Sequence, residues 1–136
     1  MNMNLAISTT MRTDRFDDAV ERTRIALAEQ GFGVLTEIDM TATLKAKLGE
    51  DMEDYRILGA CNPSLAHGAV GVDRRIGLLL PCNVIVRRDP ADDATVIVEA
   101  MDPEVMVQVT AESDLEPIAA EAATKLRAAI DALGDR

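Results

Sequence analysis

Two cysteines are the side chains in this sequence best suited to chemistry. Cys61 directly precedes Asn62 and Pro63. This pair is typical of a helix start, because asparagine caps free backbone N–H groups and proline is favoured at the first helical position. A thiol beside a helix N-terminus has a lowered pKa and can act as a thiolate. The alternative is that Cys61 is a small buried apolar residue at a strand end, as free cysteines commonly are.

The second cysteine lies in the run Leu80-Pro81-Cys82-Asn83. Proline cannot donate to a strand ladder, so this segment is expected to bulge, and a bulge can turn a side chain toward a site. A strand that follows the short helix would return beside the strand before it. Cys61 and Cys82 would then approach one another at one end of the sheet. Two unrelated core cysteines remain the alternative.

A metal centre does not follow from the spacing. The chain has no C-x-x-C motif, and its one histidine, His67, stands on the short helix after Asn62. Cys61, Cys82 and His67 would suit zinc or copper, and Met101 or Met106 would add a soft ligand. Because a lone helical histidine is usually exposed or hydrogen-bonded, we predict no metal site, and the sequence identifies no particular cofactor.

A third candidate site is charged. Glu37 and Asp39 are two residues apart at the end of a predicted strand, so they share one face, and Lys47 follows on the polar side of the next helix. Paired carboxylates beside a lysine can perform acid–base chemistry or hold a polar ligand. The alternative is a solvated strand end with surface ion pairs that contribute about 0–1 kcal/mol.

The composition excludes several functional classes. The chain has a net charge of −10 and only three aromatic residues, one Tyr and two Phe. DNA or RNA binding needs basic patches and stacking platforms, so we expect no nucleic-acid partner. No apolar run is long enough to span a bilayer, and no secretion signal is recognisable, so we expect no membrane association and a cytoplasmic protein with reduced thiols.

The elements that must position these residues form one α/β domain over residues 1–136. Alternating apolar residues and turn signals predict five strands, at residues 4–8, 32–38, 56–60, 77–88 and 95–100. The first two strands flank a helix between Thr13, its expected N-cap, and Gly31, so we expect them to pair in parallel through a right-handed crossover. The last two strands form an antiparallel hairpin. The prediction is a mixed sheet with helices mainly on one face.

The other predicted helices cover residues 40–48, 63–70 and 115–133. Ser113 and Glu116 form a capping box before the last of them. Residues 105–109 alternate like an edge strand, although a helical turn fits almost as well.

Taken together, these motifs resemble the family called domain of unknown function 302 (DUF302) over essentially the whole chain. The resemblance is carried by five segments, residues 31–39, 47–49, 59–63, 79–84 and 101–103. It implies a TT1751-like α/β fold and a homodimer in the cytoplasm, and it implies no activity. The motif positions it marks are Glu37, Asp39, Lys47, Cys61, Asn62, Pro63, Pro81, Cys82 and Asn83.

Three functions remain open. The first is a homodimeric module that binds a small ligand or ion in a cleft near Cys61 and Cys82, lined also by Asn62, Asn83 and the Glu37, Asp39 and Lys47 group. The second is a thiol enzyme or redox protein, with Cys61 as the attacking thiolate and Cys82 as the resolving thiol. The third is a structural or interaction protein without a small ligand.

Overall fold

A five-stranded sheet is the centre of the structure, a computed structural model that describes residues 5–134. The strands are β1 (Ala6–Arg12), β2 (Gly33–Asp39), β3 (Tyr55–Cys61), β4 (Cys82–Asp89) and β5 (Asp92–Met101). Their order across the sheet is β1-β5-β4-β3-β2, and every neighbouring pair is antiparallel. The predicted α/β domain with five strands is confirmed. Asn4, the first residue of the predicted first strand, lies outside the described residues.

The predicted parallel pairing of the first two strands is wrong. β1 and β2 point in the same direction, as a strand–helix–strand crossover requires, but they occupy opposite edges with three strands between them. Helix α1 (Phe16–Glu29) therefore spans the sheet rather than joining neighbours. It begins without a side-chain cap, because Thr13 Oγ1 accepts its hydrogen bond from the Arg15 N–H and not from a residue within the helix.

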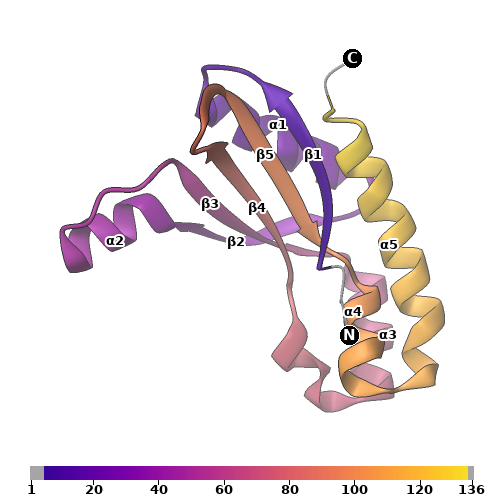
Figure 1. The fold of residues 1–136 in the computed structure, drawn as a ribbon. Helices are drawn as coiled ribbons and strands as arrows, with labels where there is room; N and C mark the ends of the chain where they lie inside the picture. The colour runs from indigo at the N-terminus through magenta and orange to yellow at the C-terminus, as the bar shows by residue number, and fades with distance from the viewer. Residues whose placement is uncertain (1–4, 135–136) are drawn as a thin grey trace.

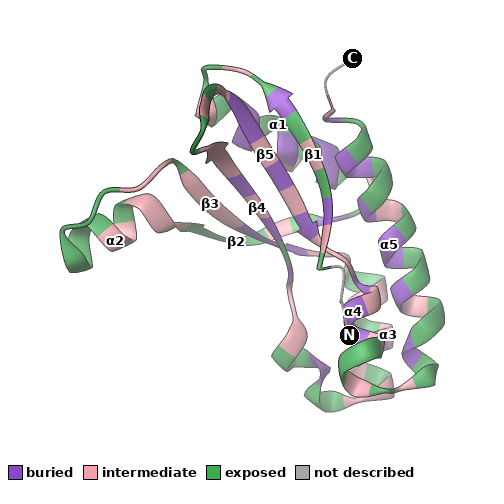
Figure 2. Ribbon diagram, viewed as in Figure 1, coloured by how far each residue is buried: buried purple, intermediate pink, exposed green. Residues whose placement is uncertain are grey.

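Two long helices, α1 and α5 (Glu116–Asp131), cover one face of the sheet (Figure 1). On the central strands β4 and β5, buried residues on that face alternate with mostly half-buried ones, and the buried positions form the main core (Figure 2). This core includes Leu58, Val84, Val86, Val96, Val98, Leu126 and Ile130. The prediction that helices pack mainly on one face is confirmed.

The short helices lie at one end of the sheet. They are α3 (Pro63–Val72), η1 (Arg74–Leu79), α4 (Glu104–Thr110) and η2 (Ser113–Leu115). Ala69, Ile76, Met106 and Leu115 form a second, smaller core among them. Helix α2 (Met40–Leu48) projects from the opposite end and contributes no buried residue (Figure 1). None of the helices within residues 5–134 combines the length and apolar character needed to cross a membrane.

Three local predictions need correction. The predicted strand over residues 77–88 begins only at Cys82, because residues 74–79 form a 3-10 helix that starts with the Asp73 carboxylate accepting from the Arg75 N–H. Residues 105–109 are helical rather than extended. The capping box does not form, because Ser113 lies inside η2 and makes no side-chain cap bond.

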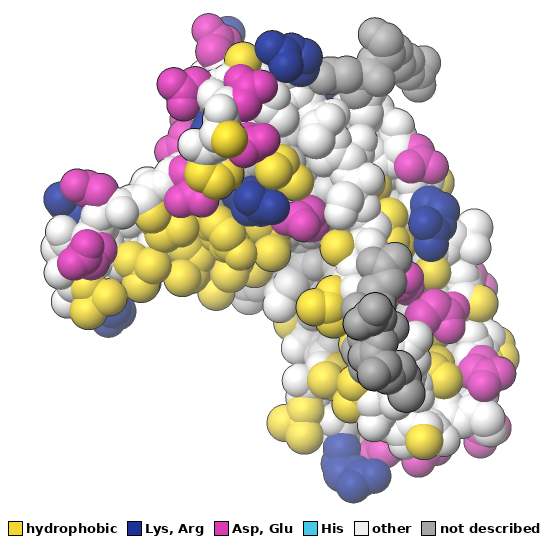
Figure 3. Space-filling model, in the orientation of Figure 1, with side chains coloured by type: hydrophobic (Ala, Val, Ile, Leu, Met, Phe, Trp, Pro, Cys, Tyr) yellow, Lys and Arg dark blue, Asp and Glu magenta, His cyan; other side chains and the backbone are white. Residues whose placement is uncertain are grey.

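The second face of the sheet is covered by no helix from residues 5–134 (Figure 1), and we call it the open face. The antiparallel register places Ile38, Ile57 and Ile85 side by side on β2, β3 and β4. Tyr55 and Ile97 lie in the adjacent row, on either side of Arg87. Figure 3 shows apolar side chains gathered in the hollow between α2 and the rest of the molecule.

Candidate functional site

One small cavity brings both cysteines together. Cys61, Asn62 and Cys82 line it, and its volume is about 30 Å³. It lies where the ends of β3 and β4 meet α3, α4 and α5. The remaining lining residues are apolar: Ala60, Leu65, Ala66, Ala69, Leu80, Met106, Ile118 and Ala122. A cavity of this size admits a water molecule or a single ion, whereas typical small-molecule pockets measure roughly 300–1,000 Å³.

Cys61 is held at the junction of a strand and a helix. It is the last residue of β3, and the Asn62 Oδ1 behind it accepts a hydrogen bond from the Leu65 N–H at 3.3 Å. Pro63 occupies the first turn of α3, where its missing N–H is not needed. The predicted helix start at Asn62 is confirmed, and it leaves the half-buried Cys61 thiol beside the helix N-terminus.

Cys82 is the more deeply buried thiol. It is the first residue of β4 and pairs with Ala60 on the helix-covered face. Burial, and to a lesser degree the nearby Cys61, raise the pKa of the Cys82 thiol to about 11. Both cysteines are free, so Cys82 is a protonated thiol at neutral pH.

The neighbouring residues show why Asn83 is not part of this cavity. Asn83 pairs with Gly59 and lies on the open face, opposite Cys82. On that face Thr36 and Pro81 cover Gly59 so closely that a β-carbon there would lie 2.1 Å from Thr36 Oγ1 and 2.8 Å from Pro81 Cγ. Gly59 is therefore required for the packing of β2 and the Leu80–Pro81 segment against β3.

Of the other side chains considered as metal ligands, only Met106 lines the cavity. His67 is exposed on α3 and is not among the residues that line the cavity. Met106, from α4, is buried and lines it, whereas Met101 does not. The sequence marks both methionines as soft donors without distinguishing them, because that choice depends on how α4 packs against α3.

Glu37 and Asp39 share one face, but their cationic partners are arginines. Arg56 on β3 pairs with Glu37 at 2.8 Å and with Asp39 at 3.4 Å, and Arg24 on α1 also pairs with Glu37. Asp39 additionally accepts the Ala42 N–H as the N-cap of α2. Because arginine keeps its proton, this cluster is a set of ion pairs rather than a proton-transfer site.

Lys47 lies apart from these carboxylates, exposed on the projecting α2. The lysine that shares a cavity with Asp39 is Lys45, which also pairs with Asp51 at 2.8 Å. The seven predicted site residues therefore separate into four locations: the cysteine cavity with Asn62, the arginine-paired carboxylates, the surface of α2, and the open face at Asn83.

The arginines of this region were missing from the sequence prediction. The guanidinium groups of Arg56 and Arg88 both lie over the Phe16 ring, at 5.9 and 5.8 Å from its centroid. Arg88 also donates to the backbone carbonyls of Thr13 and Asp93. The signal in the sequence for this cluster is Arg56, which stands near the start of β3 and pairs with Asp39 at the acidic end of β2.

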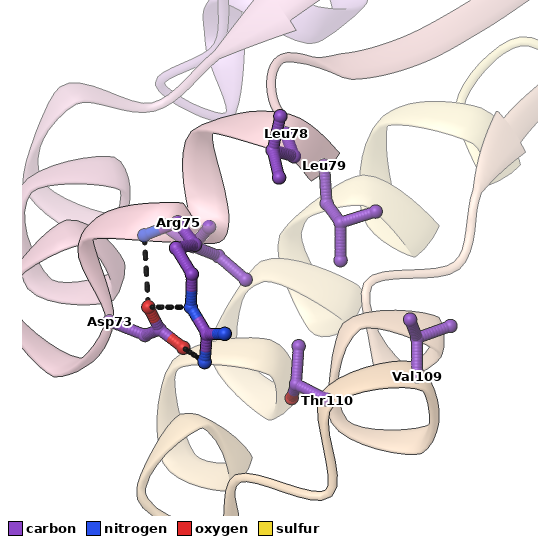
Figure 4. Close-up of a pocket in the computed structure, with 7 residues that line it drawn as sticks. Asp73, Arg75, Leu78, Leu79, Val109 and Thr110 are labelled. Atoms are coloured by element: carbon purple, nitrogen blue, oxygen red, sulfur yellow. Dashed lines mark hydrogen bonds and ion pairs between the residues drawn. The ribbon is translucent and has the colours of Figure 1, made fainter.

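A larger surface cavity of about 340 Å³ lies between η1 and α4 (Figure 4). Leu78 and Val109 line it and are 86% and 57% exposed. Its polar side chains are already engaged: Asp73 accepts three hydrogen bonds from Arg75, which lower the pKa of that carboxyl, and Thr110 donates to the Met106 carbonyl. Each of these three polar lining side chains therefore already has a hydrogen-bond partner within the protein.

A family model and a solved structure of the same family both match nearly the whole chain. The family model "Domain of unknown function DUF302" matches residues 7–133. The crystal structure of an uncharacterized conserved DUF302 protein from Bacillus stearothermophilus superposes with a TM-score of 0.86 at 26% identity. The alignment covers 96% of this chain and 99% of that one. None of the curated proteins matches.

Proposed function

Because this chain belongs to the DUF302 family, whose description assigns no activity, we propose its function from the site geometry: it is a homodimeric module that binds one small ligand or ion between Cys61 and Cys82. The observation that carries this proposal is the shared cavity, which joins two thiols from different strands to the start of α3. Its volume of about 30 Å³ limits the ligand to a single small group. The free thiols also support the proposed cytoplasmic location.

Filling the cavity tests this proposal. Ala66→Val adds two methyl groups to a lining residue, and Ala120→Val makes the same change on the exposed side of α5. We expect wild type and Ala120→Val to be stabilised by a ligand from a panel of metal ions and molecules of few heavy atoms. A ligand at about one hundred times its Kd adds about 2.7 kcal/mol, measured as a thermal shift.

Ala66→Val is expected to lose at least tenfold in affinity while keeping the native fold. The proposal would be contradicted if no ligand bound either protein and Ala66→Val were more stable than wild type by about 0.5–2 kcal/mol. That gain is expected when a substitution fills a cavity that has no binding role. That result would support the third function, a structural or interaction protein.

The homodimer is proposed on the open face. Two chains that each carry a charge of −10 repel one another, so they approach most easily through a neutral surface. In the central rows of the open face the two charged side chains are Arg87 and Glu99, which pair with each other at 2.8 Å. The isoleucines, which share a row with Glu99, supply the apolar area that a twofold interface buries.

Thiol–disulfide chemistry is the second candidate function, favoured by the same pair of thiols. The Cys61 thiolate would attack a substrate disulfide and expel one thiolate, giving a mixed disulfide. Cys82 would then lose its proton, attack Cys61 Sγ and expel the second thiolate. Two protein thiols are thereby oxidised and one substrate disulfide is reduced. The raised pKa of Cys82 makes its step slow at neutral pH, which is why ligand binding ranks first.

Alkylation distinguishes the two cysteines. In the native protein at pH 7.5, we expect iodoacetamide to modify the half-buried Cys61 and to leave Cys82 unmodified, as read by peptide mass spectrometry. Reaction at Cys82 should rise about tenfold per pH unit toward its pKa of about 11, because the thiolate is the nucleophile. Equal rates at both cysteines at pH 7.5 would instead favour the redox function. Denatured protein, in which both react, is the control.

A further inference from the structure

We propose that the ligand of this cavity is a soft monovalent metal ion of the Cu(I) class, bound by the sulfur atoms of Cys61, Cys82 and Met106. The inference rests on the proposed function, because it names the ligand of the same cavity. The three side chains come from β3, β4 and α4, and all three line the one cavity of about 30 Å³. We refer to it as the sulfur cavity.

The donor set of the sulfur cavity selects the metal. Thiolate and thioether ligands favour Cu(I), whereas Mg²⁺ and Ca²⁺ require several oxygen ligands. The Asn62 side-chain Oδ1 already accepts the Leu65 N–H as the cap of α3, and the other lining side chains are apolar. Within residues 5–134, no three His, Cys, Asp or Glu side chains come together to hold a metal, so a tetrahedral zinc set is incomplete. A low-coordinate sulfur site is what remains.

The size and surroundings of the cavity fit one ion. Binding forms two metal–thiolate bonds and releases two thiol protons to solvent, with no change of oxidation state in either partner. The product carries one net negative charge, which the N-terminal end of the ten-residue α3 stabilises beside Cys61. Apart from Asn62, the lining side chains around the three sulfur donors are apolar and offer the ion no competing oxygen ligand.

The three donors are widely separated in the chain and match no contiguous metal motif. The fold brings them together: β3 and β4 pair at Ala60 and Cys82, and α4 packs into the smaller core with Ala69 of α3. A metal bound here would therefore cross-link the sheet to the helices at its end.

The experiment measures metal binding by the full chain. Under anaerobic conditions the protein competes for Cu(I) with a chromophoric chelator, Ag(I) serves as a redox-inert probe of the same class, and native mass spectrometry gives the stoichiometry. We expect one Cu(I) or Ag(I) per chain and no stoichiometric Zn(II). X-ray absorption should show only sulfur neighbours around copper.

Variants assign the ligands. Cys61→Ser and Cys82→Ser should each weaken Cu(I) binding at least 100-fold. Met106→Leu, which keeps the packing volume and removes the sulfur, should weaken it about tenfold. Met101→Leu makes the same change outside the cavity and should leave binding unchanged. Circular dichroism checks that each variant is folded, and Met106→Leu keeps the test decisive if a serine variant unfolds.

Three results would overturn the metal assignment: unchanged Cu(I) affinity in all three ligand variants, equal affinity for Zn(II), or no binding of Cu(I) or Ag(I) by wild type. If another small molecule then binds wild type and not Ala66→Val, the proposed binding function stands and only the metal is wrong. If nothing binds wild type, both proposals fall.

Discussion

Ile57→Lys is expected to convert the proposed dimer into a monomer. Wild type should elute and sediment with twice the 14.7 kDa mass of one chain, and the variant with the mass of a single chain. The measurement is light scattering coupled to size exclusion, with sedimentation over a range of concentrations to give the dissociation constant. We expect that constant to rise at least 100-fold.

The reason lies in the position of Ile57. It is the central member of the isoleucine row, with Ile38 on one side and Ile85 on the other. A lysine there would have to be desolvated in the proposed interface, which opposes association of the two chains. In the monomer position 57 is half-buried on the open face, where the aliphatic stem of a lysine can cover the neighbouring isoleucines while its ammonium group reaches solvent. The fold is therefore retained.

A matched variant tests whether the dimer is lost because the added lysine lies on the open face or merely because the chain gains a positive charge. Ile25 is 51% exposed on α1, on the opposite side of the sheet, so Ile25→Lys makes the same change in net charge away from the open face. It should remain dimeric. A monomeric wild type, or loss of the dimer in both variants, would contradict the proposed interface.

Gly59→Ala is expected to lower the free energy of unfolding by about 2 kcal/mol, within the range of overpacking substitutions. The added β-carbon would lie 2.1 Å from Thr36 Oγ1 and 2.8 Å from Pro81 Cγ. Neither neighbour yields easily, because a β-branched side chain has few rotamers and the proline ring is rigid. Urea denaturation followed by circular dichroism gives the change.

Two further variants check this prediction. Gly33→Ala places a β-carbon where it meets no atom within 4 Å, so its unfolding free energy should stay within about 0.5 kcal/mol of wild type. Adding Thr36→Ala to Gly59→Ala removes the closer oxygen and should recover part of the loss, a coupling that a double-mutant cycle detects. If Gly59→Ala were as stable as wild type, the prediction would be wrong, because the strands could then move apart at this position without loss of stability.

Much of the local structure follows from the sequence. The turn formers between residues 89 and 93 predict the β4–β5 hairpin, and Asn62-Pro63 predicts the start of α3, because both depend on neighbouring residues. The strand order does not follow. A helix between two strands suggests that they are neighbours, but the pairing of β1 with β5 and of β2 with β3 places β1 and β2 at opposite edges.

The candidate site was likewise predictable in part from the sequence. The meeting of Cys61 and Cys82 was expected, because β4 returns beside β3. The replacement of Lys47 by Arg24 and Arg56 was not, since α2 leaves the body of the protein instead of folding back over the carboxylates. Met106 could not be distinguished from Met101, because the two differ only in which side of a tertiary contact they occupy.

The position of β1 at the sheet edge sets an order for folding during synthesis. Ala6 pairs with Met101, so β1 cannot complete its pairing in the sheet until β5 has been synthesised. The β4–β5 hairpin and its pairing with β3 close short loops and can form earlier. Until β1 joins, β5 presents an unpaired edge, the kind of surface on which nascent chains associate wrongly. Strand β1 thus acts as the closing strand of the sheet, because it is synthesised before its partner β5 and can be added only after it.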